Sequence, residues 1–403
     1  MDSKPITKGC SWKWEFLLFN AHSGYHAMCC DHNGSRVEST NNVVDISRLI
    51  NHPTMISDRQ AMLSGETLEQ CKGCYRHITD DKTIGGTMYD NYNSTAHSTR
   101  LKTLAIQLNV TCLYTCVYCS EQVSSSWYSD ADKNGSYQLF NREAHKISTL
   151  DRIHQKINVN DASKSIYHTA LRQLIASDTC DDLSILRIGG GEPLLYEKLI
   201  DFIIETHLIR PNLIIEIYTG LGVSNTILTN FLNKTATFKN KLRLVFSQES
   251  VKQQAEFMRY GTNWNKWEEM VTQIKELDYQ VEFCSVLNNM SLFTIVDFLK
   301  WKNSSIFKDD IVRIQPLRGP DYMSLRPLNE ELHKELIFKL LAIAKDTNSI
   351  DFTATTYIPI YTNSERENLQ SYLIEFAKRR NLDINVLPNE FLNFLNGTTN
   401  NGR

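Results

Sequence analysis

A chain of 403 residues with 41% hydrophobic and 10% aromatic residues carries enough apolar material for one large domain or two smaller ones, and its composition excludes global disorder. The formal charge of −3 and the pI near 6.4 lack the basic signature of a dedicated nucleic-acid binder. No apolar run approaches the roughly 20 residues that span a bilayer. The N-terminus leads into no signal-peptide core, so we expect a cytoplasmic protein without a membrane anchor.

The ten cysteines are distributed unevenly along the chain. Five lie within the first 74 residues, three lie between positions 112 and 119, and Cys180 and Cys284 stand alone. In a long chain without a secretion signal, clustered thiols indicate metal binding rather than disulfides. Cys180 and Cys284 adjoin or lie within apolar runs, and we expect them to be buried and inert.

Residues 1–98 are polar, rich in turns and short of periodicity, and Ser23-Gly24 predicts a hairpin between Phe16–Phe19 and Tyr25–Met28. A module with so little core would gain stability from a bound metal. Its candidate ligands are Cys10, Cys29, Cys30, Cys71 and Cys74. A CxxC pair with distant cysteines suits zinc or an iron–sulfur cluster. Adjacent cysteines of an extended segment point apart, so one of the pair at 29 and 30 is expected to be spare.

Residues 99–330 alternate short β-like runs with amphipathic helical stretches. The six predicted strands are Leu101–Leu108, Leu183–Ile188, Leu213–Tyr218, Leu242–Phe246, Val281–Leu287 and Ile311–Leu317. This alternation predicts a parallel sheet with right-handed crossovers, and both an open six-unit barrel and a doubly wound sheet satisfy it. A third region, residues 331–403, contains two predicted helices near Glu330–Ala344 and Arg366–Arg380.

Polar or glycine-rich segments follow the predicted strands, at the edge where parallel α/β sheets carry their chemistry. A loop with three cysteines follows the first strand, and a glycine–glutamate segment follows the second. The later segments are Thr219–Gly222, Ser247–Glu249 and Asn288.

The loop after the first strand places Cys112, Cys116 and Cys119 within eight positions. A structural zinc site requires four closed ligands, whereas three cysteines can hold three irons of a 4Fe–4S cluster and leave the fourth iron open. On spacing alone, a zinc site or a chance cluster remains the alternative.

This CxxxCxxC loop, with Tyr118 before its last cysteine, resembles the signature of radical S-adenosylmethionine enzymes, and Gly190-Gly191-Glu192-Pro193 resembles their GGEP motif. The resemblance implies a partial (β/α)6 barrel over residues 99–330. It also implies that the open iron binds the methionine part of S-adenosylmethionine. Reductive cleavage then yields a 5′-deoxyadenosyl radical that abstracts hydrogen from substrate, with electrons from a reductant such as flavodoxin or ferredoxin.

The same resemblance implies a set of cofactor-binding residues: Tyr118, Gly190, Gly191, Glu192, Thr219, Ser247, Glu249 and Arg259. Glycines allow a close backbone approach, and Glu192 can accept charge-assisted hydrogen bonds from the ammonium group. The structural alternatives are a capping role for Thr219, a solvated carboxylate at Glu249 and a surface ion pair at Arg259. The resemblance implies no residue for hydrogen transfer itself. If the sheet closes into a barrel, Glu282 and Cys284 share one face of the fifth predicted strand, and a role of Cys284 as hydrogen donor or substrate contact is the alternative to an inert thiol.

The order of the N-terminal cysteines resembles a SPASM/twitch auxiliary-cluster module, which implies a second 4Fe–4S cluster, with a structural zinc knuckle as the alternative. Arg259–Trp264 and Gly319–Leu325 resemble segments of radical S-adenosylmethionine proteins with twitch domains. Related modules imply modification of a peptide or protein side chain. The alternatives are a small-molecule substrate, such as a sugar, amino acid or nucleotide, and a non-catalytic metal-binding scaffold.

Overall fold

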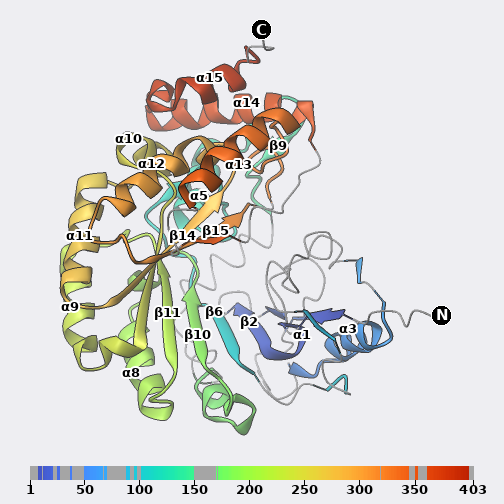
Figure 1. Ribbon diagram of the computed structural model, residues 1–403, viewed down its shortest axis with the longest axis vertical. Helices are drawn as coiled ribbons and strands as arrows, with labels where there is room; N and C mark the ends of the chain where they lie inside the picture. The colour runs from blue at the N-terminus through green and yellow to red at the C-terminus, as the bar shows by residue number, and fades with distance from the viewer. Residues whose placement is uncertain are drawn as a thin grey trace. The chain divides into compact units, whose positions relative to one another are not determined.

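The computed structural model of the chain describes residues 8–10, 12–20, 25–27, 37–38, 50–66, 68–69, 88–90, 95–97, 101–148, 169, 171–317, 319–344, 350–352 and 361–398 (Figure 1). The chain divides into two compact units, each described by itself. Unit 1 comprises Met1–Val110, Ile153–Tyr218 and Asn233–Arg243. Unit 2 comprises Thr111–Arg152, Thr219–Leu232 and Leu244–Arg403.

Unit 1 contains a mainly parallel sheet. In it, β6 (Thr103–Gln107) pairs in parallel with β2 (Phe16–Asn20) and with β10 (Ile185–Gly189). Strand β11 (Ile214–Thr219) continues the parallel order beyond β10. On the other side, β3 (Tyr25–Ala27) pairs antiparallel with β2, which confirms the predicted hairpin and extends the sheet from the N-terminal segment.

The strands of unit 1 form because their residues alternate between an apolar and a polar face. Leu186 and Ile188 of β10 are fully buried, whereas Arg187 points to the other face and bonds Glu216 of β11 at 2.9 Å. Helix α8 (Leu199–Ile209) connects these two strands, lies beside them in Figure 1, and buries Phe202 and Ile203.

A buried arginine on helix α3 (Pro53–Leu63) joins the described N-terminal segments of unit 1. The Arg59 guanidinium donates to the backbone carbonyls of Lys13 at 2.7 Å, Ile50 at 2.8 Å and Ala96 at 3.1 Å. Burial lowers the pKa of Arg59 to about 10, which leaves it charged at neutral pH. Three chain segments therefore depend on one side chain.

Unit 2 contains β12 (Leu242–Ser247), β14 (Gln280–Leu287), β15 (Ile311–Pro316) and β16 (Ile350–Phe352) as neighbours, and the last three strands run parallel. Helices α11 (Trp264–Glu276) and α12 (Ser291–Asn303) cover one face. There Phe283 packs edge-to-face against Phe298 and Trp301. Because side chains alternate along a strand, Cys284 lies on the opposite face.

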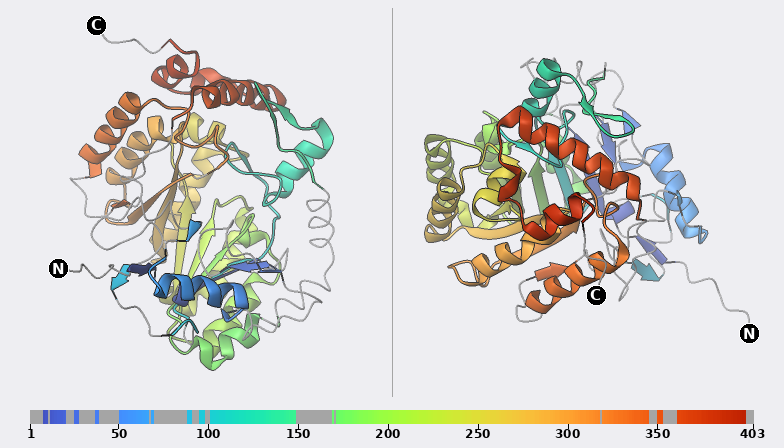
Figure 2. Two further views of the ribbon diagram at one scale, coloured as in Figure 1. Left: turned by 90° about the vertical axis from the view of Figure 1, so that its right-hand side faces the viewer. Right: turned by 90° about the horizontal axis from the view of Figure 1, so that it is seen from above.

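Unit 2 ends in helices α13 (Glu330–Ala344), α14 (Asn363–Arg380) and α15 (Asn389–Leu395), which confirms both helices predicted for the C-terminal region. Helices α14 and α15 pack together and lie side by side in both views of Figure 2. Helix α14 ends at Arg380 and is capped by Asn381, whose left-handed conformation (φ 51°) suits asparagine better than most residues.

The remaining elements are short or connect these layers. The strands are β1 (Lys8–Cys10), β4 (Val37–Glu38), β5 (Met88–Asp90), β7 (Thr115–Cys116), β8 (Tyr137–Gln138), β9 (Glu143–Ala144) and β13 (Arg259–Tyr260). The α-helices are α1 (Trp12–Glu15), α5 (Ser125–Asn134), α9 (Asn225–Thr235) and α10 (Lys252–Met258). The 3-10 turns are η3 (Asp178–Cys180), η4 (Pro193–Leu195), η5 (Ala236–Lys241) and η6 (Ile384–Val386).

The predicted fold class is confirmed. In chain order, β6, β10, β11, β12, β14 and β15 alternate with helices and cover all six predicted strands, as a partial (β/α)6 barrel requires. Among the described residues, no helix combines the length and apolar character needed to cross a bilayer. The division into residues 1–98, 99–330 and 331–403 stays a prediction.

Candidate functional site

The loop with the three cysteines lies in unit 2 and is anchored by a short strand pair. Strand β7 pairs antiparallel with β13, which sets Cys116 opposite Arg259. The amide of Val117 donates to the carbonyl of Met258 at 2.9 Å, and the amide of Cys119 donates to the carbonyl of Cys116 at 3.0 Å. The loop is therefore a defined turn that presents its thiols from fixed backbone positions.

The start of helix α5 holds the first cysteine of the loop. The hydroxyl of Ser126 donates to the carbonyl of Cys112 at 2.6 Å, and the amide of Cys112 donates to Ser125 Oγ at 3.1 Å. Ser124 caps the helix and donates its hydroxyl to the carbonyl of Tyr114 at 3.1 Å. Three successive serines thus tie the helix to the loop.

Cys116 is buried, and Cys112 and Cys119 are partly exposed. Burial raises the pKa of both Cys116 and Cys119, so their thiols are neutral without a metal and would release protons on binding one. Among the residues that the structure describes, no three side chains of metal-ligating type gather around a single ion position. Three thiols on one turn fit ligation of three separate irons of one cluster.

Arg259, Glu249 and Tyr118 form a buried group beside Cys116. Arg259 donates to Glu249 Oε2 through Nη2 at 3.0 Å and Nε at 3.3 Å, and through Nη1 to Cys116 Sγ at 3.7 Å. Tyr118 donates its hydroxyl to Glu249 Oε1 at 3.1 Å and also contacts Arg259. Arg259 and Glu249 are 5% and 0% exposed, so neither is a solvated surface charge. Three predicted cofactor residues are therefore together at the cysteine loop.

Two buried amides of unit 2 were not among the predicted site residues. Gln248 directly follows β12 and Asn288 directly follows β14, and both are fully buried. Gln248 Nε2 and Asn288 Nδ2 have no hydrogen-bond partner in the described part of the chain. Buried donors normally have a partner, so these two atoms suit the polar groups of a bound ligand. Their position directly after two strands was the available sequence signal.

Thr219 and Ser247 have different surroundings. Thr219 is buried, and its hydroxyl oxygen accepts a hydrogen bond from the amide of Leu221 at 2.8 Å. This local bond stabilises a turn in which Leu221 has a positive φ of 59°. The bond is local to this turn, and the role of Thr219 toward S-adenosylmethionine stays a prediction. Ser247 is the last residue of β12 and is partly exposed.

The glycine–glutamate segment lies in unit 1, directly after β10. Gly190 has φ +129°, and a Cβ atom there would lie 2.5 Å from the carbonyl oxygen of Asn109. The amide of Gly191 donates to that same oxygen at 2.9 Å. Glu192 is buried and accepts a hydrogen bond from the amide of Leu194 at 3.2 Å, which caps the short turn η4. Its role toward S-adenosylmethionine stays a prediction.

Of the five N-terminal cysteines, only Cys10 lies in the described part of the chain. It ends β1, is partly buried, and packs against Trp14 and Met62. The other predicted ligands, Cys29, Cys30, Cys71 and Cys74, lie outside the described residues, so the auxiliary cluster and its zinc alternative stay predictions. Cys180 and Cys284 are both buried, as predicted.

No protein-family model and no curated protein sequence matches the chain. Among solved structures, it is similar to anSMEcpe with bound AdoMet, at 13% identity over 62% of this chain and 61% of that one, with a TM-score of 0.40. It is also similar to Streptococcus suis SuiB bound to S-adenosylmethionine, at 14% identity, 87% and 72% coverage and a TM-score of 0.41. It is similar as well to SuiB bound to precursor peptide SuiA, at 13% identity over 85% of this chain and 72% of that one, with a TM-score of 0.39.

The resemblance of the cysteine loop to radical S-adenosylmethionine enzymes is a separate observation, made from the sequence. The match spans 61% of the length of the anSMEcpe chain. Identity and TM-score at this level transfer no residue role. The functional assignment therefore rests on the residues of this chain.

Proposed function

We propose that this chain is a radical S-adenosylmethionine enzyme that modifies a peptide or protein side chain. Its cysteine loop would hold a 4Fe–4S cluster through Cys112, Cys116 and Cys119. When bound, the cluster and S-adenosylmethionine supply a low-potential electron and a 5′-deoxyadenosyl radical. The observation that carries the proposal is the buried Arg259–Glu249 pair set directly against Cys116 on this loop.

Arg259 has a specific task in this proposal. Its Nη1 group lies 3.7 Å from Cys116 Sγ, where it would donate to the thiolate and balance part of its charge. Hydrogen bonds to cluster sulfurs are one of the means by which a protein sets reduction potential. Glu249 orients the guanidinium by accepting from both Nε and Nη2, and it compensates the buried cation.

The remaining residues would bind and shield the cofactor. Gln248 and Asn288 offer buried amide donors to the polar groups of the adenosyl part. Burial of Tyr118 raises its pKa, so the phenol remains a donor and keeps Glu249 in place. Gln248, Glu249 and Asn288 are fully buried, so a cofactor that contacts them would be partly shielded from water.

The decisive experiment is anaerobic reconstitution followed by incubation with S-adenosylmethionine and a strong reductant. The wild-type protein should release 5′-deoxyadenosine, and Cys116→Ala should abolish that release. Cys180→Ala is the matched control, because it removes a buried thiol outside the loop. A wild-type protein with a loaded cluster and no release would refute the enzymatic proposal. Retained release in Cys116→Ala would show that the loop is not the site.

Metal analysis separates the two forms of the N-terminal module. Two 4Fe–4S clusters require about eight irons per chain, whereas one cluster with a zinc knuckle gives about four irons and one zinc. The substrate class follows from substrate-dependent transfer of deuterium into 5′-deoxyadenosine. Transfer from a labelled peptide supports the proposal. Transfer only from a labelled sugar, amino acid or nucleotide would replace its substrate part.

A further inference from the structure

Side chains of the C-terminal helix α14 reach the cysteine loop, more than 200 positions away in sequence. The Tyr372 hydroxyl donates to the carbonyl of Val117 at 2.6 Å. Arg380, at the end of the same helix, donates through Nε to the hydroxyl of Thr115 at 2.9 Å. The two bonded residues flank the second cysteine of the loop on either side, and all members of both bonds belong to unit 2.

A third buried donor completes this set. The indole of Trp127, on helix α5, donates through Nε1 to the carbonyl of Cys116 at 2.9 Å and is 0% exposed. The guanidinium of Arg380 lies over this indole, 4.7 Å from the ring centroid. The imidazole of His145 stacks on the same indole, with ring centroids 4.1 Å apart. Three consecutive loop residues are thus each held by a side chain that is itself fixed by packing.

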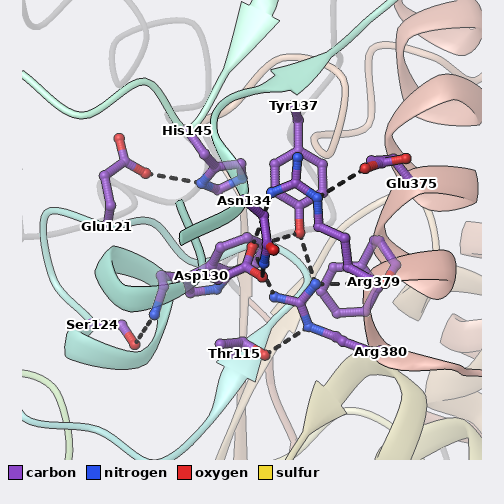
Figure 3. Close-up of polar contacts among 12 residues, drawn as sticks. Thr115, Glu121, Ser124, Asp130, Asn134, Tyr137, His145, Glu375, Arg379 and Arg380 are labelled. Carbon is purple, nitrogen blue, oxygen red and sulfur yellow. Dashed lines mark hydrogen bonds and ion pairs between the residues drawn. The ribbon is translucent and has the colours of Figure 1, made fainter. Parts of the chain in front are cut away.

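Arg380 carries a buried charge whose carboxylate partner is shared with a second arginine. Its side chain is 4% exposed, and its Nη1 group donates to Tyr137 Oη at 2.7 Å (Figure 3). The carboxylate that it meets is Asp130, at 3.5 Å from Nη2. Asp130 is shared with Arg379, whose Nη1 lies 3.4 Å away. A buried guanidinium requires paired anions. This one shares the Asp130 carboxylate with Arg379, while its Nε group donates to Thr115, the residue before Cys116.

We propose that α14 braces the cysteine loop and that Arg380 is a positioning residue for the iron–sulfur cluster. This inference rests on the proposed function, because the anionic cluster is what the buried cation would face. The brace keeps the three thiols in register, and the charge favours the reduced cluster. Outer-shell partners of metal ligands commonly have such effects on affinity and potential.

The test compares the wild-type full-length protein with Arg380→Gln, Arg380→Lys and Tyr372→Phe. The matched control is Lys378→Gln, which removes a cation of the same helix whose side chain is 79% exposed. The first measurement is hydrogen exchange of residues 112–119 in the metal-free protein. Arg380→Gln and Tyr372→Phe should each speed exchange there, and Lys378→Gln should leave it unchanged.

The second and third measurements use the reconstituted protein. Iron should be lost to a chelator about tenfold faster in Arg380→Gln than in the wild type. An EPR-monitored redox titration should show a lower midpoint potential in Arg380→Gln. The midpoint potential should stay near the wild-type value in Arg380→Lys, because the charge is kept. It should also stay near that value in Tyr372→Phe, because this substitution removes no charge. A merely structural role of Arg380 would not produce this split.

The outcomes separate the two proposals. Unchanged exchange and unchanged iron loss in Arg380→Gln and Tyr372→Phe would overturn the brace. If Arg380→Gln does not fold, Tyr372→Phe decides, because it removes one oxygen and keeps the ring. If the wild-type chain binds no iron but the variants still exchange faster at residues 112–119, the brace stands and the proposed function is refuted.

Discussion

Single residues set the backbone around the candidate site, and Gly190 gives the sharpest case. Its φ of +129° is strained for any residue with a Cβ, and the added atom would meet the Asn109 carbonyl at 2.5 Å. We expect Gly190→Ala to lower the free energy of unfolding by about 2 kcal/mol or more. Gly189→Ala is the control, because open space surrounds that position. Equal melting temperatures of the two variants would contradict the prediction.

Gln248 allows binding and stability to be separated at one position. Its Nε2 atom has no hydrogen-bond partner in the described part of the chain, and its Oε1 accepts a hydrogen bond of 3.2 Å from the amide of Glu249. Gln248→Met removes a buried donor that has no partner, which favours folding, but it also takes the Oε1 acceptor away from the Glu249 amide, which opposes folding by a similar amount. Gln248→Met should therefore keep its melting temperature but bind S-adenosylmethionine about tenfold more weakly, through the loss of about one hydrogen bond. Isothermal titration of the reconstituted protein measures this, and unchanged affinity would remove Gln248 from the site.

At the scale of helices and strands, one side chain can stabilise several segments that are distant in sequence. Helix α3 holds its neighbours through Arg59, which donates to three backbone carbonyls and to Asn51 Oδ1 at 3.1 Å. Arg59→Met would leave those buried acceptors unpaired, and we expect a loss of about 3 kcal/mol in urea unfolding. Arg172→Met removes an arginine that is 46% exposed at the side chain and pairs only on the surface with Glu205. The free energy of unfolding lost in Arg172→Met should be well under half of that lost in Arg59→Met.

The sequence predicted the C-terminal helices, but it did not predict which residues they contact. The predicted segment Arg366–Arg380 contains Tyr372 and lies inside α14. Periodicity identifies a helix because its signal is local. It does not tell which of many apolar or polar surfaces the helix meets, and the bond from Tyr372 to Val117 spans 255 positions. The brace on the cysteine loop could therefore be found only in the folded chain.

At the scale of the whole molecule, stability should depend on pH through His333. Burial lowers its pKa from the ordinary value of 6.5, so below that pH the unfolded chain binds a proton that the folded chain resists. The free energy of unfolding should fall as pH drops from 6.5 toward the lower pKa of the folded state. Above this window, His333 contributes no pH dependence.

The check is thermal unfolding on either side of pH 6.5. His333→Gln should flatten the slope of melting temperature against pH. Tyr361→Phe removes the hydroxyl that bonds His333 Nδ1 at 2.8 Å but leaves the ring buried, so it should keep the slope. A slope unaffected by His333→Gln would place the pH dependence elsewhere.

The sequence by itself determined the alternation of strands and helices, because hydrophobic periodicity is a local property that burial on one face imposes. It also determined the cysteine loop, since CxxxCxxC spacing places three thiols on one turn however the rest folds. Cys112, Cys116 and Cys119 lie where the motif implied, directly after β6 in the chain.

Only the tertiary structure decided what surrounds those thiols. Glu249 and Arg259 became a buried pair against Cys116 because β7 pairs with β13, a contact between segments 143 positions apart. Gln248 and Asn288 emerged as buried donors because their burial depends on neighbours from other strands. The charge of Arg380 beside the loop is likewise a product of packing. Such contacts follow from the free energy of the whole fold, in which no local pattern specifies the partner.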